Sequence, residues 1–253
     1  INFIPIHCSE YTEGNLLSKL KMITKSNSKP RLYSFWRSSA AFRARIALNL
    51  KGIPYDIIPV HLTKNGGAQF DPEYSAKNPT HLVPLFEDGL ASIHQSLAII
   101  EYLEETHPSP PLLPSSPSDR AWVRSLAMDI ASDIHPINNL RVLRYLVKNL
   151  GCSNESKDIW YQHWIQLGLD SLEKQLSTDS RVGRFAYGDQ PGLVEICLVP
   201  QLFNALSSGM DLSPYPTLVK ILHECLKLPA FIDASWERQV DAEGSNPSIP
   251  PQK

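Results

Sequence analysis

The chain has 253 residues, and its 24 basic and 26 acidic side chains give a formal net charge of −2. This balance provides no electrostatic footprint for nucleic acid or an anionic membrane, so neither is expected as a partner. Its apolar runs are shorter than the roughly 20 residues of a membrane-spanning helix. The four cysteines, Cys8, Cys152, Cys197 and Cys225, match no zinc or CxxC spacing. We therefore expect no metal site, and free thiols in a reducing, cytoplasmic compartment.

The first part of the chain predicts a loosely ordered extension followed by an α/β domain. Residues 1–29 lack a basic segment followed by a long apolar stretch, so they do not resemble a signal peptide. Residues 30–113 are assigned to one domain, because strand patterns and helix patterns alternate along them. Asp88 and Gly89 are a strong signal for a hairpin between two of the strands. The expected elements are strands over 32–36, 55–62, 82–87 and 90–94, and helices over 40–51 and 96–107.

Residues 108–117 contain five prolines and mark the domain boundary. Helical periodicity then replaces the strand signals, so residues 114–238 are expected to form an all-helical domain whose first helix Pro136 should kink. Residues 239–253 are assigned to a tail, and its prolines and small polar residues predict disorder. Glu101, Glu104 and Glu105 are interpreted as a solvated helix face.

Val83 and Pro84 form the first candidate binding feature. A proline in a strand removes a donor from the hydrogen-bond ladder and belongs at an edge or a special turn. A cis Val83–Pro84 bond would leave the backbone of Val83 free to pair with an extended, peptide-like ligand. A plain edge-strand proline is the alternative that the residues alone favour.

Two strand-to-helix junctions carry polar side chains. Gln95 and Ser96 open a helix whose free N–H groups attract a carboxylate. A hydroxyl of Ser38 or Ser39, at the other junction, could donate to a bound thiolate and lower the pKa of the thiol. Simple helix capping is the alternative at both junctions, and at Gln95 and Ser96 the residues alone favour it.

His135 and Asn139 are four residues apart, so we expect them on one face of a helix that borders a cleft between the domains. A metal-binding role for His135 is poorly supported, because no second ligand lies at a standard spacing.

Taken together and in this order, these segments resemble the zeta class of glutathione transferases. The similarity lies in LYSFWRSSAAFRARIALNLKGI, HQSLAIIEYLEETHP, DIHPINNLRVL, HWIQLGLDSLE and LSPYPT, and it extends over about residues 31–236. The resemblance implies a glutathione-transferase fold, with a thioredoxin-like N-terminal domain and an all-helical C-terminal domain. It also implies a homodimer that uses glutathione, needs no metal and acts on a small molecule.

The resemblance assigns roles residue by residue. Ser38 matches the catalytic serine of the family and Ser39 its neighbour, while Arg37 could hold a substrate carboxylate. The residues that match glutathione contacts are Gln69, Val83 with Pro84, Gln95, Ser96, His135 and Asn139. The implied reaction is cis–trans isomerisation of a conjugated enone or polyene through reversible addition of the glutathione thiolate.

Three positions depart from the family pattern. Ala40 replaces a cysteine; Gly192 and Glu195 replace the usual Thr and Asp of a helix cap; and residues 204–210 lack the arginine that holds a substrate carboxylate in the isomerases. The last departure predicts poor turnover of maleylacetoacetate, a dicarboxylate, and a substrate from secondary metabolism instead. A glutathione transferase that conjugates electrophiles or dehalogenates haloacids, and a non-catalytic ligand carrier, are the alternatives.

Overall fold

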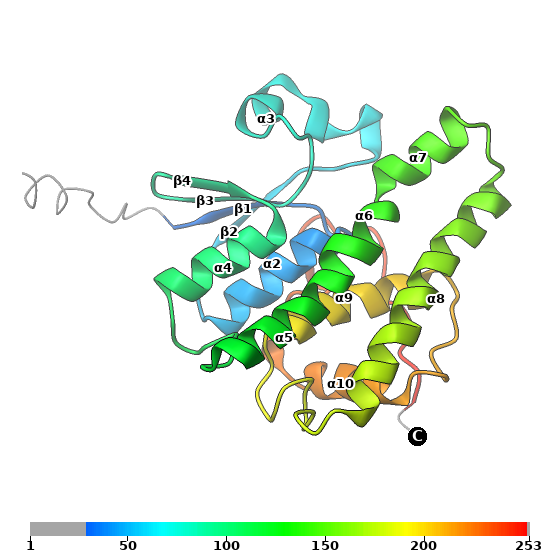
Figure 1. The fold of residues 1–253 in the computed structure, drawn as a ribbon. Coiled ribbons are helices and arrows are strands. Elements are labelled where there is room, and N and C mark those ends of the chain that lie inside the picture. Colours follow the sequence, from blue (N-terminus) through cyan, green and yellow to red (C-terminus); the bar gives the residue numbers. More distant parts are fainter. Residues whose placement is uncertain (1–28, 252–253) are drawn as a thin grey trace, which may run out of the picture.

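The structure, a computed structural model, describes residues 29–251, so the extension expected before residue 29 lies outside the described part. Its N-terminal domain is built on a four-stranded sheet in the order β2-β1-β3-β4 (Figure 1). The strands are β1 (Arg31–Ser34), β2 (Asp56–Pro59), β3 (Leu85–Asp88) and β4 (Ala91–His94). β1 runs parallel to β2 and antiparallel to β3, and β3 forms the expected hairpin with β4.

Helices cover both faces of this sheet. α2 (Ser39–Leu50) and α4 (Ser96–Thr106) pack together on one face, and α3 (Pro72–Lys77) lies on the other (Figure 1). α2 is buried along most of its length because it lies between the sheet and the helical domain. Phe42 of α2 meets Phe203 of α9 edge to face, with ring centroids 5.3 Å apart, so one apolar core continues through both domains.

The C-terminal domain is helical, as predicted. Its main helices are α5 (Pro117–Met128), α6 (His135–Ile137), α7 (Leu140–Lys148), α8 (Asn154–Thr178), α9 (Leu193–Ser207), α10 (Pro216–Cys225) and α11 (Pro229–Ile232). α9 is the central one, and it packs against α2, α5 and α10. Glu195 compensates for the lost helix cap, because its carboxylate accepts hydrogen bonds from the N–H groups of Gly192 and Ala186, each 2.7 Å long.

The kink expected at Pro136 is a full interruption of the helix. A π-helical turn over Asp129–Ile134 follows α5, and the short α6 then ends before Asn139, which begins α7 in an extended conformation. Pro136 lacks the N–H that a regular helix needs at this position, so the helix is broken here. Single π-helical turns of this kind are frequent at functional sites. The chain therefore changes direction where it borders the N-terminal domain.

A buried ion pair fixes the linker between the domains. Lys51 Nζ lies 2.6 Å from Glu104 Oε2 and donates to the carbonyls of His107 and Pro110 at 2.7 Å. The same carboxylate accepts from the N–H of Leu112. The interpretation of Glu104 as a solvated residue is therefore wrong: its place in the helical pattern does not reveal Lys51, 53 positions earlier.

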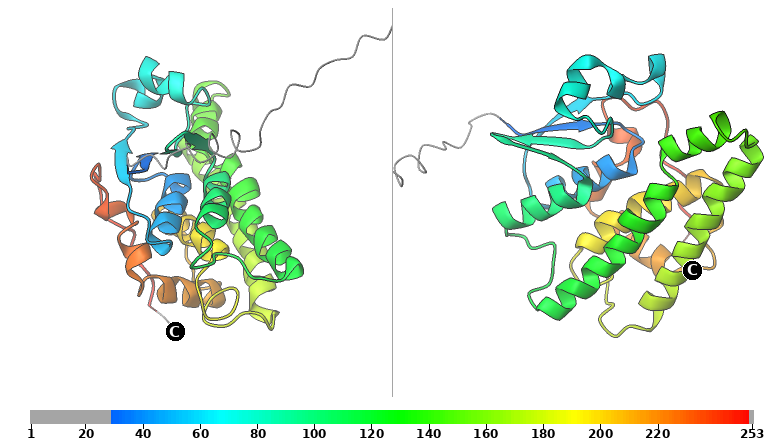
Figure 2. Two further views of the ribbon diagram at one scale, coloured as in Figure 1. Left: turned by 90° about the vertical axis from the view of Figure 1, so that its left-hand side faces the viewer. Right: turned by 45° about the horizontal axis from the view of Figure 1, so that its top comes forward.

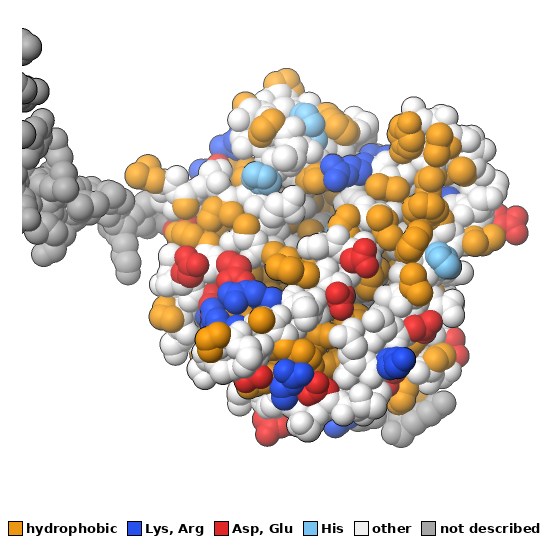
Figure 3. Space-filling view, viewed as in Figure 1, with side chains coloured by type: hydrophobic (Ala, Val, Ile, Leu, Met, Phe, Trp, Pro, Cys, Tyr) orange, Lys and Arg blue, Asp and Glu red, His pale blue; other side chains and the backbone are white. Residues whose placement is uncertain are grey.

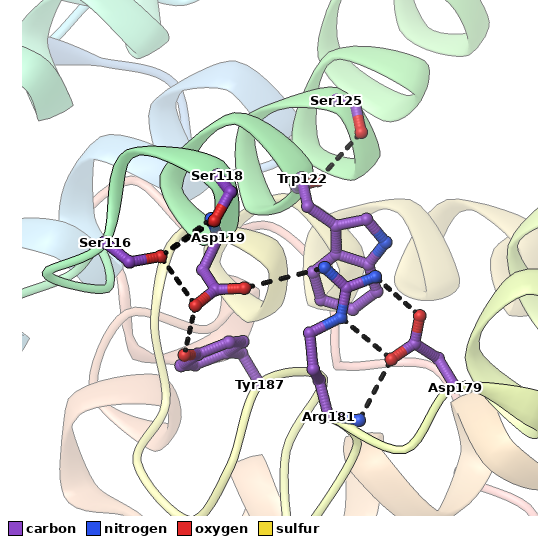
Figure 4. Close-up of polar contacts among 8 residues, drawn as sticks. All are labelled: Ser116, Ser118, Asp119, Trp122, Ser125, Asp179, Arg181 and Tyr187. Carbon is purple, nitrogen blue, oxygen red and sulfur yellow. Dashed lines mark hydrogen bonds and ion pairs between the residues drawn. The ribbon is translucent and has the colours of Figure 1, made fainter.

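A second polar cluster lies at the far end of the helical domain (Figure 4). Arg181 binds both Asp179 and Asp119, and its guanidinium stacks 3.8 Å above the ring of Trp122. Asp119 also accepts from Tyr187. Hydrogen bonds from Arg181 lower the pKa of Asp179 to about 2. The cluster joins the start of α5 to the segment after α8.

The C-terminal tail differs from the expectation of disorder. The N–H of Trp36 donates to Asp241 at 3.1 Å, Glu243 forms ion pairs with His61 and Lys64, and the carbonyl of Pro250 lies 2.7 Å from the His223 ring. The orange-to-red end of the chain thus runs along the N-terminal domain (Figure 2). The prolines and small polar residues of this segment predict disorder, and composition does not reveal the contacts that order it, because the partner residues lie far away in sequence.

Candidate active site

A cleft of about 370 Å³ lies between the two domains. Six of the residues proposed from the sequence line it: Val83, Pro84, Gln95, Ser96, His135 and Asn139. They come from the turn before β3, the β4–α4 junction and the interruption between α6 and α7. Residues more than 50 positions apart are therefore brought into one site.

The Val83–Pro84 peptide is cis, and it precedes β3. The carbonyl of Leu82, one residue earlier, accepts hydrogen bonds from Tyr74 and Asn78 at 2.5 Å and 2.8 Å. Among the described residues, the backbone N–H and C=O of Val83 have no partner. Because buried backbone groups are nearly always paired, an extended ligand that pairs with Val83 fits this wall of the cleft.

Gln95 adopts a left-handed backbone conformation, with φ at 74°, and Ser96 begins α4 directly after it. Non-glycine residues rarely adopt this conformation, and they do so most often at functional sites. Here the turn directs the buried Ser96 and the N-terminus of α4 into the cleft. The junction therefore offers hydrogen-bond donors to a carboxylate.

Ser38 caps α2, as its hydroxyl oxygen accepts from the N–H of Ala41 at 3.2 Å. Capping occupies the oxygen as an acceptor and leaves the hydroxyl proton free to donate. Ala40, two residues later, lines the cleft, so the N-terminus of α2 adjoins it. Ser39 is buried and accepts from the side chain of Asn204 at 2.7 Å, which joins this loop to α9.

Arg37 is exposed, and its Nη2 donates to Ser207 Oγ at 2.6 Å. Its guanidinium also lies over the ring of Trp236, 5.4 Å from the centroid. Arg37 thus reaches the end of α9, where the sequence lacks the arginine of the isomerases. Residues 204–210, which contain no arginine, therefore still have a positive charge beside them, that of Arg37 at Ser207.

His135 and Asn139 both line the cleft, but they do not share a helix face, so this expectation is wrong. Asn139 is the N-cap of α7 and accepts from the N–H of Arg141. Burial, and the charge of Arg43 in second place, lower the pKa of His135 to about 3. His135 is therefore neutral near pH 7.

Gln69 does not line the cleft. Its side chain is buried beside Gly67, its Nε2 lies 3.4 Å from the carbonyl of Leu62, and its Oε1 has no partner among the described residues. A contact between Gln69 and glutathione would require this side chain to rotate outward.

The cleft residues that the sequence did not point to include two arginines, Arg43 of α2 and Arg141 of α7. Arg43 resembles a core position because it lies in an apolar helix, and Arg141 resembles an ordinary exposed residue at a helix start. The available signal was an arginine within a helix that is otherwise buried, since such a residue needs a partner.

Within residues 29–251, no three His, Cys, Asp or Glu side chains are grouped as metal ligands would be. In the same residues, no helix has both the length and the apolar character required to span a bilayer.

Comparisons with known proteins give a consistent result. Residues 32–111 match the model of the glutathione S-transferase N-terminal domain. A probable maleylacetoacetate isomerase of Vibrio cholerae is 49% identical, over 83% of this chain and 97% of its own. Maleylpyruvate isomerase of a Ralstonia species is 43% identical over 84% and 99% of the two chains, and mouse maleylacetoacetate isomerase is 46% identical over 84% and 95%.

Solved structures show the same relationship. The holo structure of a zeta-class maleylpyruvate isomerase has a TM-score of 0.81 and 43% identity, and the match covers 84% of this chain and 99% of that one. A maleylacetoacetate isomerase of Methylobacterium extorquens, solved with malonate and glutathione, also has a TM-score of 0.81, with 40% identity over 85% and 100% of the two chains. The chain therefore belongs to the zeta class of glutathione transferases, the family of the maleylacetoacetate and maleylpyruvate isomerases.

Proposed function

We propose that the protein is a glutathione-dependent cis–trans isomerase of a conjugated enone acid. The observation that carries this proposal is the cleft itself, which combines the unpaired backbone of Val83, the α4 N-terminus at Ser96 and the adjoining N-terminus of α2. When bound, glutathione supplies a thiolate that adds reversibly to the substrate double bond.

The residues have separate roles in this proposal. Val83 pairs with the backbone of glutathione, and Gln95 and Ser96 bind its γ-glutamyl end. Ser38 donates its hydroxyl proton to the glutathione sulfur and, with the α2 N-terminus, favours the thiolate. Neutral His135 and Asn139 are available as hydrogen-bond partners beside the bound molecule.

Two arginines support an acidic substrate. Arg141 lines the cleft, and Arg37, which is not among its lining residues, is held by Ser207 at the end of α9; guanidinium groups bind carboxylates in two-point contacts. In Figure 3 basic side chains (blue) lie between α7 and the N-terminal domain. A cis-enone with one carboxylate on Arg37 is the substrate class that we propose.

The proposal is tested by incubating the protein with glutathione and a panel of cis-enone acids, including maleylpyruvate, with chromatographic analysis of products. Formation of the trans isomer with glutathione unchanged supports isomerisation. A covalent glutathione adduct, or halide release from a haloacid, would support the transferase alternative. Binding of glutathione with no reaction and an unshifted thiol pKa would support a ligand carrier.

We further infer a cytoplasmic homodimer. Cys197 and Cys225 are buried free thiols, as suits a reducing compartment. The dimer is inferred from the family resemblance, and the exposed apolar side chains of Phe70, Leu90 and Met128 are candidates for the contact with a second copy. Light scattering at micromolar concentration should report twice the mass of one chain, and a single-chain mass would contradict the dimer.

A further inference from the structure

Arg43 and Arg45 lie two residues apart on α2, are both at most 2% exposed and differ in their partners. Arg45 donates hydrogen bonds to the carbonyls of Ala234, Phe35 and Trp36 and to the Ser34 hydroxyl. It also has a carboxylate nearby, that of Asp241. Arg45 is therefore a structural residue with a satisfied side chain.

Arg43 has one hydrogen bond, from its Nε to Ser96 Oγ at 2.9 Å. Its Nη1 is buried and has no partner among the described residues. None of the residues that line the cleft is Asp or Glu within the described part of the chain. Arg43 thus places a buried positive charge beside the cleft with no negative charge to balance it.

An unbalanced buried charge is costly, and a ligand that brings the opposite charge removes that cost. The position of the missing charge is indicated by Ser96, because its oxygen accepts from Arg43 and its proton is left to donate. A carboxylate at the N-terminus of α4 would receive this proton and lie near the Arg43 guanidinium.

We propose that Arg43 is the specificity-determining counter-ion for the α-carboxylate of the γ-glutamyl group, acting on it through Ser96 and through its own charge. The inference rests on the proposed function, because it takes glutathione as the ligand. It adds a reason for selectivity: ligands without this carboxylate leave the Arg43 charge uncompensated. In this role Arg43 is a positioning residue that does not touch the reacting sulfur.

The test compares glutathione with two analogues in isothermal titration calorimetry. The first, 4-aminobutanoyl-Cys-Gly, lacks the α-carboxylate, and the second, 4-carboxybutanoyl-Cys-Gly, keeps a carboxylate and lacks the amino group. The wild type should bind the first analogue at least about tenfold more weakly than glutathione, since a hydrogen bond to a charged group is lost. Arg43→Met should weaken glutathione binding by about the same factor and abolish the preference for the carboxylate.

Arg45→Met is the matched control, because it removes an equally buried arginine from the same helix. It should lower the free energy of unfolding and leave the ratio of affinities for glutathione and the first analogue unchanged. Arg43→Lys, which keeps the charge, should retain part of the preference and covers the case in which Arg43→Met does not fold. Ser96→Ala combined with Arg43→Met should weaken binding less than the product of the single effects.

An unchanged affinity ratio in both Arg43 variants overturns the inference, as does an equal loss of affinity for all three ligands. Absence of glutathione binding in the wild type instead overturns the proposed function, and the inference with it. Binding of glutathione by the wild type with no isomerase activity leaves the calorimetric test of Arg43 valid.

Discussion

Arg37 and Ser207, separated by 170 positions in sequence, are joined by a hydrogen bond of 2.6 Å at the point where the N-terminal domain meets the end of α9. Ser207 thus positions a guanidinium that belongs to the other domain. This arrangement allows a test of how many carboxylates the substrate carries.

Replacing Ser207 with arginine should add a second guanidinium beside Arg37. We expect kcat/KM for a dicarboxylate such as maleylacetoacetate to rise about tenfold or more, which corresponds to about 1.4 kcal/mol of transition-state binding. The value for a monocarboxylate cis-enone should change much less, so steady-state kinetics with both substrates give the answer. Efficient wild-type turnover of maleylacetoacetate with no gain in Ser207→Arg would mean that Arg37 and Arg141 already hold both carboxylates.

Ser38→Ala should depress turnover of every substrate, because it removes the proton donor from the glutathione sulfur. The pKa of bound glutathione, followed by thiolate absorbance, should rise toward that of the free thiol. Helix capping alone would cost about 1 kcal/mol of stability and leave this pKa unchanged, so the variant Ser38→Asn, another good N-cap, serves as the control. If the pKa of bound glutathione in Ser38→Ala stays as low as in the wild type, the serine acts only as a helix cap.

His135 predicts an acid-dependent loss of stability. Burial lowers its pKa to about 3 in the folded state. The unfolded chain takes up a proton near pH 6.5, and the folded protein does not, so the free energy of unfolding should fall as pH drops below about 6.5. His135→Gln should remove this contribution, about 2 kcal/mol between pH 7 and pH 5. Urea unfolding of both proteins at the two pH values measures it, and equal pH slopes would contradict the prediction.

Lys51→Met should destabilise the domain linker strongly. It leaves the Glu104 carboxylate buried without its cation, for an expected loss of about 3–5 kcal/mol. The control is Glu101, which lies on α4 like Glu104. It pairs with Arg124, and both side chains are about one-third exposed. Glu101→Gln should cost at most about 1 kcal/mol. Chemical denaturation of the two variants provides the comparison, and similar losses would show that the Lys51 pair is no more important than a surface pair.

The sequence predicts the order of elements well, because the strand, helix and turn signals of the N-terminal domain are local. It also identifies six of the residues that line the cleft, among them Val83, Gln95 and Ser96, which lie at turns with distinctive residues. For Arg43 the sequence offers only the signal of an arginine in an apolar helix, and the absence of a partner for its Nη1, which points to a role at the cleft, is seen only in the structure. The joint orientation of His135 and Asn139 was wrong because the helix break between them depends on the packing of the π-helical turn.

The helix α2 contributes both to the stability of the fold, through Arg45, and to the proposed recognition of the ligand, through Arg43. One helix carries the satisfied Arg45, which binds the C-terminal segment at Ala234, and the unsatisfied Arg43, which faces the cleft. Because they lie two residues apart, the two side chains leave the helix in different directions, and which of them meets the cleft depends on how α2 packs.

The tail that contacts Trp36, His61 and Lys64 has a practical consequence for handling the protein. Asp241 accepts a hydrogen bond from the N–H of Trp36, directly before Arg37, so a change to the segment around Asp241 reaches the loop that carries Arg37 and Ser38. An affinity tag or fluorophore attached there is not a neutral label. Labels meant to leave the loop undisturbed belong on an exposed residue of α8, such as Ser171, which lies on another part of the molecule.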